Sequence, residues 1–261
     1  MPTITESFCK NNSRYKANQK FKPVGVILHS IGCPQPDAAV LQRSWANNAS
    51  PYVTHYVLDD KKILHCMPND RRCWHVGSPG NAKWLGIEMC EPKQIKYTSG
   101  ASFTVSDKAA ARKYAAACYE NAVWLLAKLC KEYGWNPSTD ILTHREVTMR
   151  KLSNTDHVDP EHLWNGLGLG YSLAKLRKDV AAAMGKTTAS ATANASTATK
   201  GGYLVKITAN TLNVRAGAGT SFKINTTVKK GGVYTIVEEK NGWGKLKSGA
   251  GFISLKYTER V

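Results

Sequence analysis

The segment THREVTMRKLSNTDHVDPEHLW, residues 143–164, gathers side chains that can bind a metal ion or carry a proton. It contains His144, His157, Asp159 and His162, in a chain that has only seven histidines. Imidazole nitrogens and carboxylate oxygens are ligands that zinc takes in proteins. The composition of this segment therefore raises the hypothesis of a metal centre.

Three apolar segments each carry a polar group at or near the carboxyl end: His29 follows VGVIL, Glu88 lies within LGIEMC, and His144 follows DIL. In open α/β sheets, sites form at the carboxyl ends of strands. Two histidines and one carboxylate make a three-ligand zinc site with an open position for water. Asp159 is the predicted carboxylate, with Asp156 as the alternative, and Glu88 is predicted to take a proton from the water.

Plainer explanations exist for each of these residues taken alone. A single histidine at the end of a strand is more often structural than a ligand, and Glu88 could pair with one of the many basic side chains. His65 and His162 are expected to be structural. All seven histidines lie before residue 163. The residue pattern by itself leaves a metal site and a structural role about equally open.

The elements that would hold these groups alternate between strands and helices. Apolar runs without alternation predict strands buried on both faces, and capping residues with 3.6-residue periodicity predict helices. The predicted strands are Val24–Leu28, two strands in THYVLDDKKILHC, residues 85–90 and ILTHR, and the predicted helices are AAVLQRSWAN after Asp37, Asp107 to about Tyr133 before Gly134, and Ser172–Met184. This order predicts an α/β fold, with a mixed central sheet flanked by helices.

Residues 185–202, GKTTASATANASTATKGG, have the composition of a flexible linker. We therefore predict a catalytic domain at 1–184 and a second domain at 203–261. No apolar run approaches the roughly 20 residues of a membrane span, so no transmembrane segment is predicted. The amino terminus lacks the apolar core of a secretory signal, which predicts synthesis in the cytoplasm without classical export.

Seven cysteines, with no CxxC pair, do not resemble a disulfide framework. They are expected to be reduced and mostly buried. Cys33 and Cys90 lie close in sequence to His29 and Glu88; burial in the core is favoured for both over an occasional metal-ligating role.

The formal net charge of +17 indicates an acidic partner. Residues 203–261 hold 10 basic and 3 acidic residues, a net charge of +7, and are the most densely basic part. No helix-turn-helix or zinc-finger spacing is present, so nucleic acid is not a predicted partner. In this tail, short β-rich segments such as TLNVR and VYTIVEE alternate with Gly and Asn turns, a pattern typical of a small all-β barrel.

Several stretches, in order, resemble the zinc-dependent N-acetylmuramoyl-L-alanine amidases, whose fold is shared by phage lysins and peptidoglycan recognition proteins. They are VILHS, THYVLDD, DRRCWHVG, NAKWLGIEMCEP and THRE...HVDPEHLW, which cover roughly residues 20–180. The resemblance implies that His29, His144 and Asp159 bind Zn²⁺ and that Glu88 is the general base. The reaction would release the stem peptide from N-acetylmuramic acid.

The position two before the last ligand is often a Lys that stabilises the oxyanion, and here it is His157. The resemblance thus implies a catalytic role for His157 as a hydrogen-bond donor. It also implies that His75 and Asn81 line the substrate groove. His55 fits a strand motif, with a buried core role as the alternative, and Thr54 stands where some members carry a catalytic Tyr.

The tail, with LNVRxGxGT, NGWGKL and GFISxxY, resembles a bacterial SH3-type domain, which implies binding to peptidoglycan or anionic wall polymers. Trp243 is expected in the barrel core, with a surface formed by Trp243, Tyr257 or Tyr203 as the alternative. Together, the two resemblances imply a phage or prophage endolysin that acts on the wall of a Gram-positive host. Release would need a membrane pore formed by another protein. The alternatives are a bacterial autolysin and a non-catalytic recognition protein.

Overall fold

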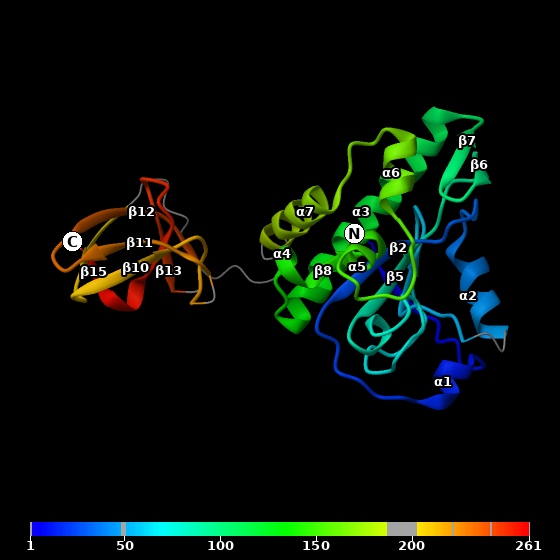
Figure 1. The fold of residues 1–261 in the computed structure, drawn as a ribbon, viewed down its shortest axis with the longest axis horizontal. Helices are drawn as coiled ribbons and strands as arrows, with labels where there is room; N and C mark the ends of the chain where they lie inside the picture. Colours follow the sequence, from blue (N-terminus) through cyan, green and yellow to red (C-terminus); the bar gives the residue numbers. More distant parts are fainter. Residues whose placement is uncertain (1, 48–50, 187–202, 221, 241, 261) are drawn as a thin grey trace. The chain divides into compact units, whose positions relative to one another are not determined.

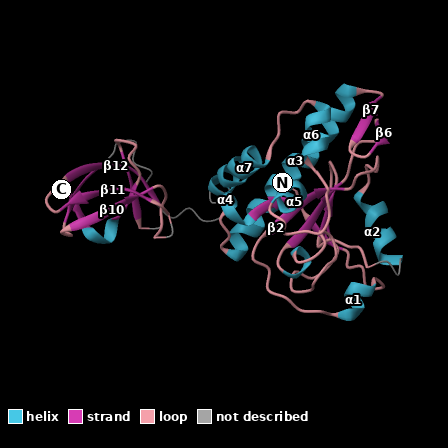
Figure 2. Cartoon of the chain, viewed as in Figure 1, coloured by secondary structure: helices cyan, strands magenta, loops and turns pink. Residues whose placement is uncertain are grey.

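The computed structural model describes residues 2–47, 51–186, 203–220, 222–240 and 242–260 (Figure 1, Figure 2). The chain divides into two compact units, residues 1–192 and 193–261. Most of the predicted linker, from residue 187 to 202, lies outside the described residues. The predicted boundaries at 184 and 203 therefore stay predictions.

The first unit is built on a six-stranded mixed sheet, as the sequence predicts. β5 pairs in parallel with β2 and β3, and β2 with β8, whereas β3 and β4 are antiparallel. In spatial order the strands are β1 (Ile4–Glu6), β4 (Ile63–His65), β3 (Tyr56–Leu58), β5 (Leu85–Met89), β2 (Val26–Ser30) and β8 (Ile141–Thr143). The strand predicted from Val24 begins at Val26, because the Val24 N–H binds the Lys83 carbonyl outside the ladder and its side chain stays 51% exposed.

Helices cover both faces of this sheet (Figure 2). They are α1 (Ser13–Ala17), α2 (Ala38–Asn47), α3 (Lys108–Tyr133), α4 (Pro137–Asp140), α5 (His144–Met149), α6 (Glu161–Leu167) and α7 (Leu173–Lys186), with a 3₁₀ turn, η1, at Gly80–Ala82. α3 begins and ends as predicted: the Asp107 carboxylate accepts the Ala110 N–H, and Gly134 closes the helix with φ +70°.

Side chains along β5 point alternately to the main core and to the opposite face of the sheet. Leu85, Ile87 and Met89 pack in the core formed with α3 and α7. Because successive side chains of a strand point to opposite faces, Gly86 and Glu88 face the other side of the sheet. The sheet thus places Glu88 on the face opposite its main core.

A short hairpin, β6 (Ile95–Ser99) and β7 (Ser102–Val105), forms a separate two-stranded sheet. Its Ile95 and Phe103 pack with Leu163 and Leu167 of α6. The hairpin is therefore anchored to the helix that follows Asp159.

The second unit is a seven-stranded antiparallel sheet. Its spatial order is β11 (Ile224–Lys229), β10 (Thr211–Arg215), β14 (Phe252–Ser254), β13 (Trp243–Leu246), β12 (Val233–Lys240), β9 (Tyr203–Ile207) and β15 (Thr258–Arg260), with η3 at Leu255–Tyr257. Its core contains apolar residues only, among them Val205, Val214 and Ile253. Within the described part of the chain, no helix is long and apolar enough to cross a bilayer.

Candidate active site

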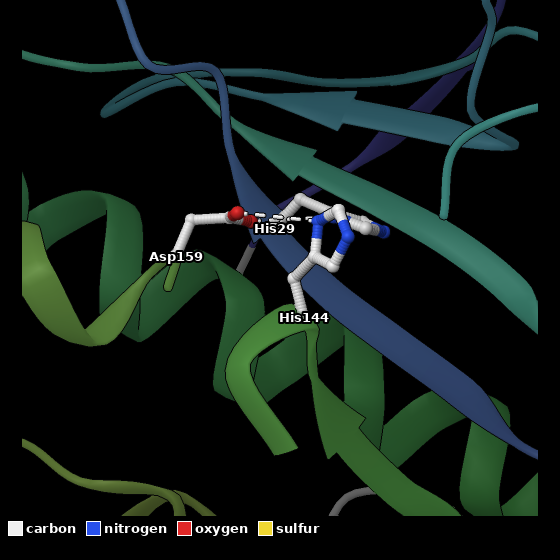
Figure 3. A group of neighbouring side chains, drawn as sticks. All are labelled: His29, His144 and Asp159. Carbon is white, nitrogen blue, oxygen red and sulfur yellow. Dashed lines mark hydrogen bonds and ion pairs between the residues drawn. The ribbon is translucent and has the colours of Figure 1, made fainter. Parts of the chain in front are cut away.

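Three segments far apart in the sequence bring His29, His144 and Asp159 together (Figure 3). His29 lies on β2, His144 is the first residue of α5 directly after β8, and Asp159 precedes α6. All three side chains are buried. Thr143 caps α5 with its hydroxyl and so fixes the turn that presents His144.

The facing atoms of the three residues are close to one another. The Asp159 carboxylate lies 3.3 Å from His29 Nδ1 and 3.2 Å from His144 Nδ1, and the two Nδ1 atoms are 3.1 Å apart. Four ligands at about 2.0–2.1 Å from a tetrahedral zinc ion are about 3.3–3.4 Å from one another. Both the types of donor and their spacing therefore fit a zinc ion.

Hydrogen bonds of the other ring nitrogens orient both histidines. His75 Nε2 is 3.2 Å from the Trp84 carbonyl oxygen, which can only accept, so His75 Nδ1 is left to accept from His29 Nε2 at 2.9 Å. These two hydrogen bonds place the proton of His29 on Nε2 and leave the lone pair of its Nδ1 facing Asp159. Gly86 makes room for the His75 ring, since a Cβ at Gly86 would lie 2.6 Å from it.

His144 is held in the same way. Its Nε2 is 2.7 Å from the Thr155 hydroxyl, so its Nδ1 also faces the carboxylate. The Thr143 hydroxyl donates to Glu161 Oε1 at 2.7 Å. This buried bond joins the residue before His144 to the segment that follows Asp159.

Burial and mutual charge shape the ionisation of the group. Burial lowers the pKa of His29, which favours its neutral, metal-binding form. Burial alone would raise the pKa of Asp159, but its proximity to His144 and His29 holds that pKa below its usual range. The site therefore presents an anionic carboxylate and a neutral imidazole.

Glu88 lies beside His29, because the two residues are register partners on the parallel strands β2 and β5. Its side chain is 9% exposed. Burial, followed by the charges of Asp159 and Glu91, raises the pKa of Glu88 well above its usual value. Glu88 therefore has a stronger tendency to take up a proton than an exposed glutamate.

An open cleft gives solvent access to the group. It is lined by Glu88, by the three metal-ligand candidates and by the aromatic residues Trp45, Tyr52 and Trp74. His157 also lines it, with a side chain 60% exposed and Nδ1 3.8 Å from Asp159. The structure thus brings six of the seven predicted site residues to one cleft, the sixth being His75, which contacts His29.

Asn81 is the exception, since it is not among the residues that line the cleft. Its Oδ1 accepts the backbone N–H groups of His75 and Val76, each at 2.9 Å. A contact of Asn81 with substrate stays a prediction. Its described contacts hold the backbone of the His75 segment.

His55, just before β3, is fully buried, and His65, at the end of β4, is half-buried. His55 Nδ1 accepts the Gly86 N–H at 3.0 Å and its Nε2 donates to the Arg71 carbonyl at 2.9 Å. His65 stacks on Tyr56 and contacts Asn69. These contacts agree with a buried structural role for His55 and with the expected structural role of His65.

Sequence reasoning missed two polar residues near the site, Glu91 and the half-buried Tyr97. Glu91, two residues after the end of β5, is fully buried, and burial raises its pKa to about 7. Tyr97 on β6 donates its hydroxyl to Glu91 at 2.7 Å. The sequence signal that could have found Glu91 was its place just beyond the predicted LGIEMC strand.

The expectation that Cys33 is buried was wrong, because Cys33 is exposed on the loop after β2. Cys90 is buried, and all seven cysteines are free.

In the second unit, the expected core tryptophan is only half-buried. Trp243 on β13 lies outside the buried core cluster, and Tyr257 is 44% exposed. The Tyr203 hydroxyl donates to Glu239. These aromatic residues therefore lie at least partly on the surface of the unit.

Comparisons with known proteins agree with this geometry. Residues 19–162 match the family model described as N-acetylmuramoyl-L-alanine amidase, and residues 210–259 match the model described as bacterial SH3 domain. The N-acetylmuramoyl-L-alanine amidase CwlA of Bacillus subtilis is 30% identical over 94 residues, which is 34% of this chain and 33% of CwlA. CwlH of the same species is 25% identical over 162 residues, 60% of this chain and 55% of CwlH. The chain thus spans between a third and about half of these relatives.

Solved structures share the fold of the first unit. The Staphylococcus aureus hydrolase AmiA, solved with its ligand, superposes with a TM-score of 0.55 at 21% identity, covering 72% of this chain and 86% of AmiA. The PlyG catalytic domain gives a TM-score of 0.52 at 18% identity, covering 74% and 99%. At these identities the likeness concerns the fold alone.

Proposed function

The chain belongs to the N-acetylmuramoyl-L-alanine amidase family, and on that premise we propose that it hydrolyses the amide between N-acetylmuramic acid and the L-alanine of the stem peptide. The observation that carries this proposal is the convergence of His29, His144 and Asp159 in an open cleft beside Glu88. Three potential ligand atoms that face one another among the residues lining a solvent-accessible cleft match a three-ligand catalytic zinc site with an open position for water.

His29 Nδ1, His144 Nδ1 and an Asp159 oxygen would hold a zinc ion. When bound, zinc would supply Lewis acidity that polarises the scissile carbonyl and makes the attacking water more acidic. His75 and Thr155 orient the two imidazoles through their Nε2 atoms. The protein's contribution at this step is therefore a preset donor geometry.

Glu88 would act as general base. Its buried carboxylate would take the proton from the attacking water. It would then pass that proton to the amine of L-alanine as the amine leaves. His157, on the exposed side of Asp159, would donate a hydrogen bond to the oxygen of the tetrahedral intermediate. Trp45, Tyr52 and Trp74 would contact the substrate along the cleft.

The second unit would hold the enzyme at the wall. Its match to a bacterial SH3 domain and its charge of +7 suit a polyanionic wall surface. We assign the protein to the endolysins of phages or prophages of Gram-positive hosts, synthesised in the cytoplasm and released through a pore made by another protein. Expression inside a Gram-positive cell tests this: lysis is expected only when a pore-forming protein is co-expressed.

The activity itself is tested with purified Gram-positive peptidoglycan. New L-alanine amino termini with intact muramic acid should appear, disappear with a chelator and return with zinc. Stable wall binding without cleavage by the metal-loaded protein would instead identify a recognition protein.

A further inference from the structure

Asp159 lies at the end of an exposed segment. The side chain of His157 is 60% exposed and that of Val158 is 39% exposed, whereas Asp159 and Pro160 are buried. The residues before Asp159 therefore contribute little packing that could fix its carboxylate. What holds it must come largely from the segments packed on its other side.

A hydrogen-bonded cluster of Glu91, Tyr97 and His162 connects to the segments on that other side. The Tyr97 hydroxyl donates to Glu91 Oε2 at 2.7 Å and lies 2.6 Å from His162 Nε2, from which its oxygen can accept. Glu91 is fully buried, the His162 side chain is 9% exposed and Tyr97 is half-buried. These residues come from the loop after β5, the strand β6 and the helix α6.

The cluster connects to both segments that position Asp159. Glu91 Oε1 accepts the Gly32 N–H at 3.1 Å, and two residues earlier the Ser30 N–H donates to Asp159 Oδ2 at 3.2 Å. His162 lies on the first turn of α6, three residues after Asp159. Through Glu91, the Tyr97 hydroxyl thus joins the loop that follows Ser30 with the helix that follows Asp159.

We infer that Glu91, Tyr97 and His162 are positioning residues that preset Asp159 for metal binding, an inference that rests on the proposed function. The hairpin itself does not depend on the Tyr97 hydroxyl, because Ile95 and Phe103 pack against α6 through apolar contacts. The hydroxyl is needed for the connection between Glu91 and His162. None of the three residues bonds a metal-ligand candidate directly; they act through the backbone from Gly32 to Ser30 and through the first turn of α6. Removing outer groups that orient the ligands typically changes metal affinity.

The test compares two substitutions that remove the same atom. Tyr97→Phe should weaken zinc binding about tenfold, measured as the zinc dissociation constant by competition with a chelator. Tyr119→Phe is the matched control, because the Tyr119 hydroxyl also donates to a carboxylate, Asp179 at 2.8 Å, but joins α3 to α7 in the main core. Its zinc affinity should equal that of the wild type. The visible spectrum of the Co²⁺-substituted protein should change in Tyr97→Phe only.

Each outcome decides something different. If the wild type binds zinc and Tyr97→Phe binds it as tightly as Tyr119→Phe does, the positioning network is refuted and the proposed function stands. If the wild type itself does not bind zinc, both fail.

Should Tyr97→Phe not fold, His162 supplies the comparison. His162→Gln keeps a nitrogen donor for Tyr97 and should stay within about threefold of the wild-type zinc affinity, whereas His162→Leu should lose about tenfold. Equal affinities in these two variants would refute the network.

Discussion

The two units handle polar groups in opposite ways. In the first unit, polar and charged side chains are buried from Asn12 to Glu161, and the metal-ligand candidates, Glu88 and Glu91 are among them. In the described part of the second unit, every buried residue is apolar, and its three glutamates lie at the surface in ion pairs with Lys245, Arg260 and Lys206. Exposed pairs of this kind contribute little to stability. The groups proposed for the reaction are thus desolvated, whereas the charged groups of the second unit stay in water.

Among substitutions in the first unit, the largest loss of zinc binding and activity should come from replacing the candidate ligand Asp159. Asp159→Asn removes the anionic ligand and should abolish zinc binding, with activity reduced by about 10³-fold or more. Asp156→Asn, at an exposed position three residues earlier, is the control and should retain both. Metal content by mass spectrometry and amidase assays measure the two. Loss of zinc in the control with retention in Asp159→Asn would mean that the other carboxylate is the ligand.

A different kind of loss is expected for Glu88→Gln. The amide cannot accept the proton of water, so kcat should fall by about 10²- to 10⁴-fold while zinc content stays at the wild-type level. Measuring kcat and bound zinc on the same preparation separates the two roles. Activity near wild type would remove Glu88 from the mechanism.

Removing the second unit tests the other half of the comparison. A chain ending at residue 186 should bind purified cell walls about tenfold or more weakly, since one of two attachment surfaces is gone. Its cleavage of a soluble muropeptide should be unchanged. Wall binding by the isolated second unit should weaken with rising salt, because its charge is exposed. Loss of soluble cleavage in the truncated chain would show that the units depend on each other.

The smallest effect is a difference in acid sensitivity. Burial lowers the pKa of His55 to about 3, so the folded state favours the neutral ring and the unfolded state binds the proton. The stability that His55 contributes is full above about pH 6.5 and falls with decreasing pH until about pH 3. The loss at pH 5 is about 2 kcal/mol.

Taken alone, the His55 contribution lowers the Tm of the first unit by about 4–8 °C between pH 7 and pH 5, whereas protonation of Glu91, whose pKa is raised to about 7, acts in the opposite direction. Thermal melts of the first unit and of its His55→Gln variant at pH 7 and pH 5 isolate the His55 contribution. Equal acid sensitivity in the wild type and the variant would contradict the assignment.

The site was predictable where one strand end or one cap determines a position. His29 and His144 follow strands that pair in parallel, so both had to emerge at one edge of the sheet, and Asp107 and Gly134 set the ends of α3 by local geometry. The Glu91, Tyr97 and His162 cluster was not predictable in this way. Its members are brought together by hairpin docking across 65 residues, and no local pattern encodes that contact.

Exposure was predicted less well than secondary structure. Cys33 is a small apolar residue of a type that is usually buried, yet the loop after β2 turns it to solvent. Trp243 is half-buried and lies outside the core of the second unit, whose buried side chains are aliphatic. In both cases the packing of distant segments decided the outcome.

The pairing of His29 with Glu88 across two parallel strands also matters for protein engineering. The spacing of neighbouring strands, about 4.8 Å, is fixed by backbone hydrogen bonds and not by any loop. Trp45 lies on α2, Tyr52 on the loop before β3 and Trp74 on the loop before η1, all outside that ladder. Segments that carry these aromatic residues can therefore be exchanged without altering the backbone ladder that sets the spacing of Glu88 and His29.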